Sequence, residues 1–231
     1  MNYYKIELKI FYLTYIVLNK MANTNNTSHI TAIYNSRKYL LEILGERGYD
    51  ISTYENFTIN EVGLMLEYDQ LDMLIEKTST QKKIYVKYYV GKVLKTQNIY
   101  DMIQDLFHLE NVLTKKDDLI IITKDEPNDT LRQNVKDIWN DEGNYISLIN
   151  IKRLQYNVLK HELQPKFTKL NDVETAAFKV KYNILHDKQI PDISYFSPVS
   201  LVLGFRPGDV IHCLRTSRTA IETDFYRICK I

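Results

Sequence analysis

Apolar residues change their spacing several times along this 231-residue chain, and each spacing predicts a different kind of element. Between residues 30 and 47 they recur on one helical face, and Gly48 provides a typical C-terminal stop. A second, shorter helix is predicted over residues 59–66. Two apolar runs, 71–75 and 83–90, are separated by a short polar stretch and predict a β-hairpin.

Further along, the pattern alternates between helix and strand. Helical spacing over residues 99–109 is followed by an Ile-rich strand at 119–122, helical spacing over 130–139 and another apolar strand at 146–151. This alternation predicts crossover connections on a partly parallel sheet, and uninterrupted Ile runs are typical of strands that are covered on both faces.

The last third of the chain mixes short helices and strands after a boundary near residues 153–165. A helix is predicted over 173–182, with Asp172 as its N-terminal cap. Residues 189–193 are expected to be extended, because the proline among them restricts the residue before it. A last strand is predicted over 224–229. Together these elements predict a small α+β module.

The stretch SPVSLVLGFRPGDVIHCLR, residues 197–215, has the clearest local signals. Ser197 and Pro198 predict the cap and first turn of a short helix, and Gly204 predicts its left-handed end, with the next residue folding back onto the apolar face. A tight turn over 206–209 and a mostly buried strand are expected to follow.

Within that turn, Gly208 is expected to have a positive φ. A Gly208→Val substitution should therefore be destabilising, because a β-branched side chain is strongly disfavoured in that conformation.

These elements predict two domains. The fold class is an α/β N-terminal domain, with a mixed, partly parallel sheet, followed by a small α+β C-terminal domain. The expected boundaries are 1–24 for a leader or disordered extension, 25–155 for the first domain and 156–231 for the second.

Composition supports a globular chain, with 45% apolar and 12% aromatic residues. The net charge of +1 argues against a strongly basic, autonomous nucleic-acid binder. Residues 1–150 carry 17 basic and 21 acidic side chains, a net −4, whereas 151–231 carry 13 and 8, a net +5; the two values sum to +1. The two parts are therefore expected to have different partners.

The cysteines and histidines do not predict a metal site. Cys213 and Cys229 lie in apolar surroundings and are expected to be buried free thiols, with a disulfide as the less favoured alternative. A structural zinc ion needs about four ligands, and none of the five histidines has the required spacing.

The first twenty residues include an apolar run from Phe11 to Leu18, which is too short for a membrane-spanning helix. Translation starting at Met21, with the preceding residues as a leader, is the favoured interpretation. Few Gly and Pro residues and many Asn, Ile, Lys and Tyr residues fit an AT-rich genome, as in large DNA viruses and some parasites.

The C-terminal third contains, in this order, KHELQP at 160–165, the helix 173–182, QIPDI at 189–193, SPV at 197–199, LGF at 203–205, PGDV at 207–210 and YR at 226–227. This ordered series resembles the fifth-largest subunit shared by the nuclear RNA polymerases, which has a one-domain counterpart in archaea. Arg47-Gly48-Tyr49 and the segment up to Leu154 resemble its eukaryotic N-terminal domain, which the archaeal form lacks. The resemblance therefore points to a eukaryotic-type version, with a large DNA virus as the favoured source.

The resemblance implies a non-catalytic subunit of a multisubunit DNA-directed RNA polymerase. In that family the C-terminal domain packs on the largest subunit, and the N-terminal domain contributes to the lower jaw near downstream duplex DNA. Catalysis belongs to the two large subunits, so no cofactor, metal, small-molecule ligand or membrane is expected for this chain. The implied location is the nucleus, or the host cytoplasm and virion for a viral protein.

Two positions depart from the family pattern. Ser197 replaces the usual Asp, and serine caps a helix about as well. The usual glycine before the final Tyr-Arg pair is absent, which bears on the geometry of the loop at 216–223.

The residues predicted to bind a partner combine the rigid turns with the basic side chains of the C-terminal domain. Arg206 is taken as an isolated surface charge, so Arg206→Ala is expected to leave stability nearly unchanged. The complete set is His161, Pro165, Pro198, Arg206, Pro207, Gly208, Arg215, Arg218 and Arg227.

The resemblance also implies a nuclease-like fold for the N-terminal domain, because that domain of the family is similar to restriction-type endonucleases. The alternative function is therefore a stand-alone, nuclease-like DNA-binding protein. Asp72 and Lys87 are placed as in a magnesium-dependent nuclease, but Tyr85 occupies the position where such a site needs a second carboxylate. The acidic pairs 117–118 and 125–126 at the ends of the Ile-rich strand are expected to be solvated.

Overall fold

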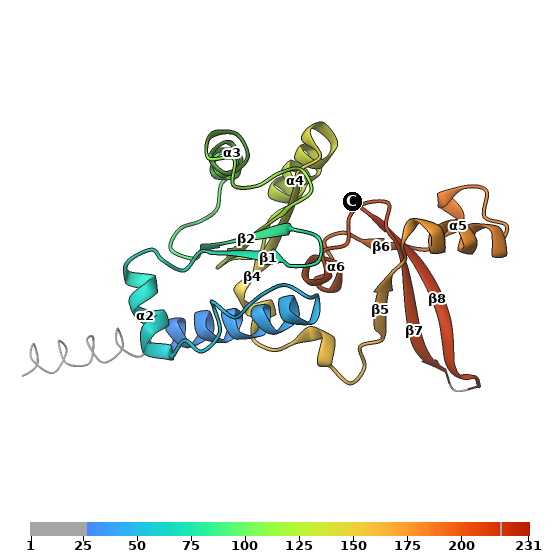
Figure 1. Ribbon diagram of the computed structural model, residues 1–231, viewed down its shortest axis with the longest axis horizontal. Helices are drawn as coiled ribbons and strands as arrows, with labels where there is room; N and C mark the ends of the chain where they lie inside the picture. The colour runs from blue at the N-terminus through green and yellow to red at the C-terminus, as the bar shows by residue number, and fades with distance from the viewer. Residues whose placement is uncertain (1–26, 218) are drawn as a thin grey trace, which may run out of the picture.

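The computed structural model describes residues 27–217 and 219–231, which form two four-stranded sheets with helices around them (Figure 1). The predicted leader and Arg218 lie outside the described residues. The first part contains a first helix (27–46), α2 (Ile59–Glu67), β1 (Met73–Lys77), β2 (Lys82–Tyr89), α3 (Thr96–Ile103), η1 (Gln104–Leu109), β3 (Asp118–Thr123), α4 (Asp129–Glu142) and β4 (Tyr145–Asn150). The remainder contains η2 (Ile151–Leu154), η3 (Val158–Lys160), β5 (Lys166–Lys169), α5 (Asp172–Lys181), η4 (Asp187–Gln189), β6 (Asp192–Ser194), α6 (Pro198–Leu203), β7 (Val210–Ser217) and β8 (Ile221–Lys230).

The N-terminal sheet has the strand order β1-β2-β3-β4. The β1–β2 hairpin is antiparallel, whereas β2–β3 and β3–β4 are parallel, which confirms the predicted partly parallel sheet. Helices α3 and α4 lie over one face, and the first helix and α2 lie over the other (Figure 1). Every residue of β3 and β4 is buried, as expected for strands that are covered on both faces.

The helix predicted over residues 99–109 changes its geometry midway. Helix α3 ends at Ile103 and continues as the π-helix η1, which buries Leu106 and Phe107. Helical spacing alone does not distinguish these two hydrogen-bond patterns, because they differ by only one residue per backbone hydrogen bond.

The C-terminal sheet has the strand order β5-β7-β8-β6. Helix α5 covers one face through a small cluster of Phe178, Ile190, Val210 and Ile228. Side chains of the opposite face, including Ile211 and Cys229, belong to the same apolar core as α6 and the N-terminal sheet. The chain therefore contains a large core that spans both sheets and a small one under α5.

The predicted capping and turn geometry of residues 197–209 is confirmed. The Ser197 side chain caps α6 by accepting a hydrogen bond from the Ser200 N–H, and Gly204 ends the helix with a φ of 70°. Phe205 folds back and is buried. Gly208 has a φ of 93°, and its N–H donates to the Cys229 carbonyl, which fastens the turn to β8.

Three local predictions need correction. Asn171, not Asp172, caps α5, in a reciprocal capping box with Glu174. Gln189 lies in the short helix η4 instead of an extended segment. Strand β8 begins at Ile221, because pairing with β7 extends the ladder beyond the apolar residues that marked the strand.

Candidate docking surfaces and the junction between the sheets

The two sheets meet around Asp118, at the start of β3. Its side chain is only 1% exposed, and its carboxylate lies 2.7 Å from Lys82 Nζ, 2.9 Å from Arg206 Nη2 and 3.6 Å from Arg47 Nη2. Burial lowers the pKa of Lys82, opposed by the attraction of Asp118. The prediction that residues 117 and 118 are solvated is wrong, because the turn after α6 covers this end of β3.

Arg206 belongs to this contact between the two sheets, which we call the junction and which also includes Asp118, Lys82 and Arg47. The Arg206 Nη2 group also donates to the backbone carbonyls of Lys116 and Asp117, at 2.7 and 3.3 Å. The guanidinium carbon lies 5.4 Å from the centre of the Tyr145 ring. Arg206 is therefore not an isolated surface charge, and the reason for expecting Arg206→Ala to be neutral is wrong.

Arg47 and Gly204 form the second half of the junction. Arg47 Nη1 donates to the Val202 carbonyl at 3.1 Å, so the guanidinium lies against the end of α6. A Cβ atom added at Gly204 would collide with that guanidinium. Glycine at 204 thus allows the positive φ and also lets the Arg47 guanidinium stay against α6, where a larger residue would force that side chain to shift. This pairing could not be predicted from the sequence.

Tyr195 joins the two sheets through their shared core. It is 1% exposed, and its hydroxyl donates to the Ile146 carbonyl of β4 at 2.6 Å. Its ring meets Tyr145 edge to face, with the ring centres 5.5 Å apart. Burial raises the pKa of Tyr195 well above its ordinary value, so the phenol remains a donor. Apolar packing and polar bonds together fix the orientation of the C-terminal sheet relative to the N-terminal one.

Beyond the junction, β7 and β8 continue as a two-stranded ribbon (Figure 1). On one face of it, the guanidinium carbons of Arg215 and Arg227 lie 5.0 and 5.1 Å from the centre of the Phe225 ring. Arg227 also donates to the Asp192 carbonyl at 2.7 Å, while Arg215 is exposed. We call these three residues the ribbon face; aromatic and Arg side chains of this kind are enriched at protein interfaces.

The opposite face of the ribbon has an aromatic cluster. Phe178 and Tyr226 stack with ring centres 4.2 Å apart, and Tyr182 packs beside both. His212 adds a ring 5.1 Å from Tyr226, and its Nε2 lies 2.7 Å from an Asp224 oxygen. Sequence analysis missed this cluster, because its members come from α5, β7 and β8 and meet only through the strand register.

The other predicted partner residues are spread over the C-terminal module. His161 is exposed, and its Nδ1 accepts a hydrogen bond from the Leu163 N–H. Pro165 immediately precedes β5, and Pro198 is the exposed first residue of α6. Pro207 and Gly208 form the turn that fastens to β8. The structure therefore separates the predicted set into a junction, a ribbon face and isolated turns.

The nuclease-like residues do come together. The Asp72 carboxylate accepts hydrogen bonds from Lys87 Nζ at 2.5 Å, the Tyr85 hydroxyl at 3.2 Å and the Tyr88 N–H at 3.1 Å. A magnesium ion would have to displace these donors, and Tyr85 supplies a phenol whose pKa is raised to about 12 by burial and by Asp72. Over residues 27–217 and 219–231, no group of three His, Cys, Asp or Glu side chains could hold a metal.

Two further expectations concern the cysteines and the membrane. Cys213 and Cys229 are buried free thiols, as predicted, and burial raises the pKa of Cys229 to about 12. In the part of the chain that the structure describes, no helix is long and apolar enough to span a bilayer.

Comparison with known proteins points to one family. Residues 156–229 match the family model "RNA polymerase Rpb5, C-terminal domain". A Methanosarcina acetivorans protein, DNA-directed RNA polymerase subunit Rpo5, is 35% identical over 74 residues, which are 32% of this chain and 94% of that protein.

Longer relatives extend the similarity into the N-terminal part. The Arabidopsis thaliana DNA-directed RNA polymerases IV and V subunit 5B is 27% identical over 184 residues, covering 77% of this chain and 80% of the relative. The Dictyostelium discoideum DNA-directed RNA polymerases I, II, and III subunit rpabc1 is 24% identical over 205 residues, covering 87% and 98%. Together with the C-terminal match, these similarities confirm the resemblance read from the motifs: the chain belongs to the Rpb5 family of RNA polymerase subunits.

Proposed function

We propose that this chain is a non-catalytic subunit of a multisubunit DNA-directed RNA polymerase. Its C-terminal module docks on the largest subunit, and its N-terminal domain contributes to the lower jaw beside downstream DNA. One observation carries the proposal: the chain itself covers only part of the C-terminal sheet, and the ribbon face remains open. This face lies in the segment that is similar to almost the whole length of the archaeal subunit.

The ribbon face has the chemistry of a docking surface. Arg215 and Arg227 bracket an aromatic ring, so a partner can bury the ring while its acidic or carbonyl groups pair with the guanidinium groups. The β7–β8 pairing fixes the spacing of these side chains before a partner arrives, which lowers the entropic cost of association.

The jaw role does not depend on a generally basic surface. Residues 1–150 carry a net charge of −4, and a net negative domain is a poor autonomous binder of DNA. We therefore propose that the N-terminal domain acts through its fixed position. The junction around Asp118 holds it at a set angle to the docking module.

The domain division at residues 25–155 and 156–231 is part of the same proposal. A fragment from about residue 157 to the C-terminus is expected to fold and to bind the largest subunit. Without β4, however, it would expose Tyr195 and the α6 side chains that pack on the N-terminal sheet. Absence of a cooperative melt for this fragment would argue against the division.

The alternative nuclease function has little support in the site geometry. Asp72 is a single carboxylate whose oxygens are already paired with Lys87, Tyr85 and the Tyr88 N–H. Metal-assisted hydrolysis needs carboxylates that are free to coordinate the ion.

The test is purification of the tagged full chain from its native source. Co-elution with two very large subunits is expected, and a monomer that cleaves DNA with magnesium would support the alternative function. Arg215→Glu should reduce co-elution without changing the melting temperature, because Arg215 is exposed. Lys188→Glu makes the same charge change at an exposed position away from the ribbon face and should leave co-elution intact.

A further inference from the structure

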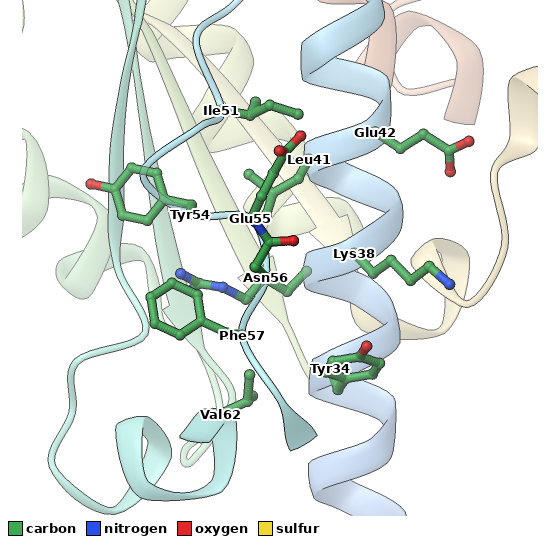
Figure 2. Close-up of a pocket in the computed structure, with 11 residues that line it drawn as sticks. Tyr34, Lys38, Leu41, Glu42, Ile51, Tyr54, Glu55, Asn56, Phe57 and Val62 are labelled. Atoms are coloured by element: carbon green, nitrogen blue, oxygen red, sulfur yellow. The ribbon is translucent and has the colours of Figure 1, made fainter. Parts of the chain in front are cut away.

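A cavity of about 460 Å³ opens between the first helix and the loop that leads to α2 (Figure 2). Leu41 and Tyr34 border it from the helix, and Tyr54 and Phe57 border it from the loop. This volume lies within the range of small-molecule and side-chain pockets. It belongs neither to the junction nor to the ribbon face.

Arg37 is the unusual member of the cavity lining. The residue is only 3% exposed, and its guanidinium carbon lies 5.6 Å from the Tyr54 ring centre and 5.4 Å from that of Phe57. Burial lowers the pKa of Arg37, but a guanidinium remains charged in proteins. Among the described residues, no carboxylate forms an ion pair with it, so a buried positive charge is left without a counterion.

One nitrogen of this guanidinium is hydrogen-bonded, and another is buried without a partner. Nη1 donates to the Leu71 carbonyl at 2.9 Å, whereas the buried Nε has no hydrogen-bond partner among the described residues. The edge formed by Nε and Nη2 is the one that binds a carboxylate side-on through two parallel hydrogen bonds. Leaving a buried donor and a buried charge unpaired is costly, unless a ligand pairs with them.

The rest of the lining narrows the ligand class. Lys38, Glu42 and Glu55 border the cavity with Arg37, and Glu42 also pairs with Lys160. The formal charges of these five residues sum to +1, which suits a monoanion better than a dianion such as phosphate. The aromatic and aliphatic walls favour an apolar body. We propose that the cavity binds a carboxylate carried on an aromatic or aliphatic body, with the carboxylate on the Nε edge of Arg37.

Such a carboxylate can come from a small organic acid or from an acidic side chain beside an aromatic one in a partner protein. Two probes distinguish these sources on the purified full chain by calorimetric titration: 3-phenylpropionate, and the capped peptide Phe-Glu-Phe. If 3-phenylpropionate saturates the site and binds at least as tightly as the peptide, the cavity is a small-molecule site. Binding of the peptide alone would identify a protein segment.

Three comparisons test the role of Arg37. The neutral amide of 3-phenylpropionate and the corresponding Gln peptide should bind at least about tenfold more weakly than the acids. Arg37→Met should abolish binding of both acidic probes, while Lys188→Met, which removes a positive charge at an exposed position outside the cavity, should alter it less than about threefold. Arg37→Met should also raise the melting temperature of the free protein, because the unpaired buried charge is removed.

Absence of binding of either acid to the parent protein would overturn the proposal, as would equal binding of acids and neutral analogues. These measurements use the isolated chain, so their outcome is independent of whether it assembles with a polymerase.

Discussion

The two sheets of this protein are covered to different extents. In the N-terminal sheet, every residue of β3 and β4 is buried, because helices lie over both faces. In the C-terminal sheet, α5 and α6 cover only part of each face, and residues 221–224 of β8 are all exposed. The first sheet buries its apolar side chains within the chain, whereas the second leaves a ribbon exposed that another molecule can cover.

The contact between the two sheets differs in composition from both of them. It combines the apolar packing of Tyr195 with a buried carboxylate that is shared by three cations. Buried ion pairs contribute less to net stability than to specificity of geometry, and removing one partner is costly. The junction therefore sets how the covered sheet and the open sheet are oriented, and its variants should have the largest effects.

The largest effect is expected for Asp118→Asn. The substitution removes the only carboxylate that pairs with Lys82 and Arg206 in the described ion pairs, leaving part-buried cations without a counterion. The free energy of unfolding should fall by about 3–5 kcal/mol, measured by urea unfolding. Asp125→Asn, at an exposed position at the other end of the strand, should change it by less than about 0.5 kcal/mol. Equal effects of the two variants would contradict the junction.

The next largest loss of stability is expected at Gly204, which we compare with Gly208 because both glycines have a positive φ. Gly204→Ala should lower the free energy of unfolding by about 2–4 kcal/mol, because the methyl group adds a collision with Arg47 to the backbone strain. Gly208→Ala should cost only about 1–2 kcal/mol, since its added Cβ meets no atom within 4 Å. Arg47→Ala should remove most of the excess at Gly204, and a double-mutant cycle by chemical denaturation measures this coupling. Additive effects of the two substitutions would show that Arg47 is not the obstacle.

A smaller loss of stability is expected for Arg206→Ala, and Arg215→Ala in the same module is the comparison. Arg206→Ala should destabilise the protein by about 1.5–3 kcal/mol, because the charged group donates to Asp118 and to two carbonyls. Arg215→Ala should change stability by less than about 0.5 kcal/mol, since this side chain is exposed. Thermal and urea unfolding would show the difference. No change in the free energy of unfolding for Arg206→Ala would show that Arg206 is the isolated surface charge predicted from the sequence.

The last effect appears only at alkaline pH and concerns the covered sheet. Burial raises the pKa of Tyr88 to about 12, whereas an unfolded phenol ionises near pH 10. Between these values the folded state holds the extra proton, so this group makes the free energy of unfolding fall as pH rises, by at most about 1.4 kcal/mol per pH unit. Tyr88→Phe should flatten this dependence between about pH 10 and pH 12 while leaving that below about pH 9 unchanged. The same slope in parent and variant would contradict the assignment.

Local chemistry explains why most elements could be predicted from the sequence. The Ile run of β3, the Ser197 cap, and the left-handed Gly204 and Gly208 depend on the residues themselves and their near neighbours. The π-helix after α3 and the Asn171 cap were missed because competing local patterns differ there by one residue.

The candidate site was predictable only in part. The sequence predicts Arg215 and Arg227 as basic residues of a partner-binding set, but their shared ring, Phe225, follows from the β7–β8 register. The roles of Asp118 and Arg206 were misread because each was judged from its own segment. These residues are 88 positions apart in sequence, and the hydrogen bond between them exists only in the folded chain.

Most strands, several helix ends and the family could be predicted from the sequence alone, because apolar periodicity, capping residues and ordered motifs are local properties of the chain. Which charges are buried and which are open to a partner could be seen only in the folded chain. Burial and ion pairing depend on which distant segments cover a side chain: α6 and its turn cover Asp118, the loop before α2 encloses Arg37, and no described segment covers Arg215.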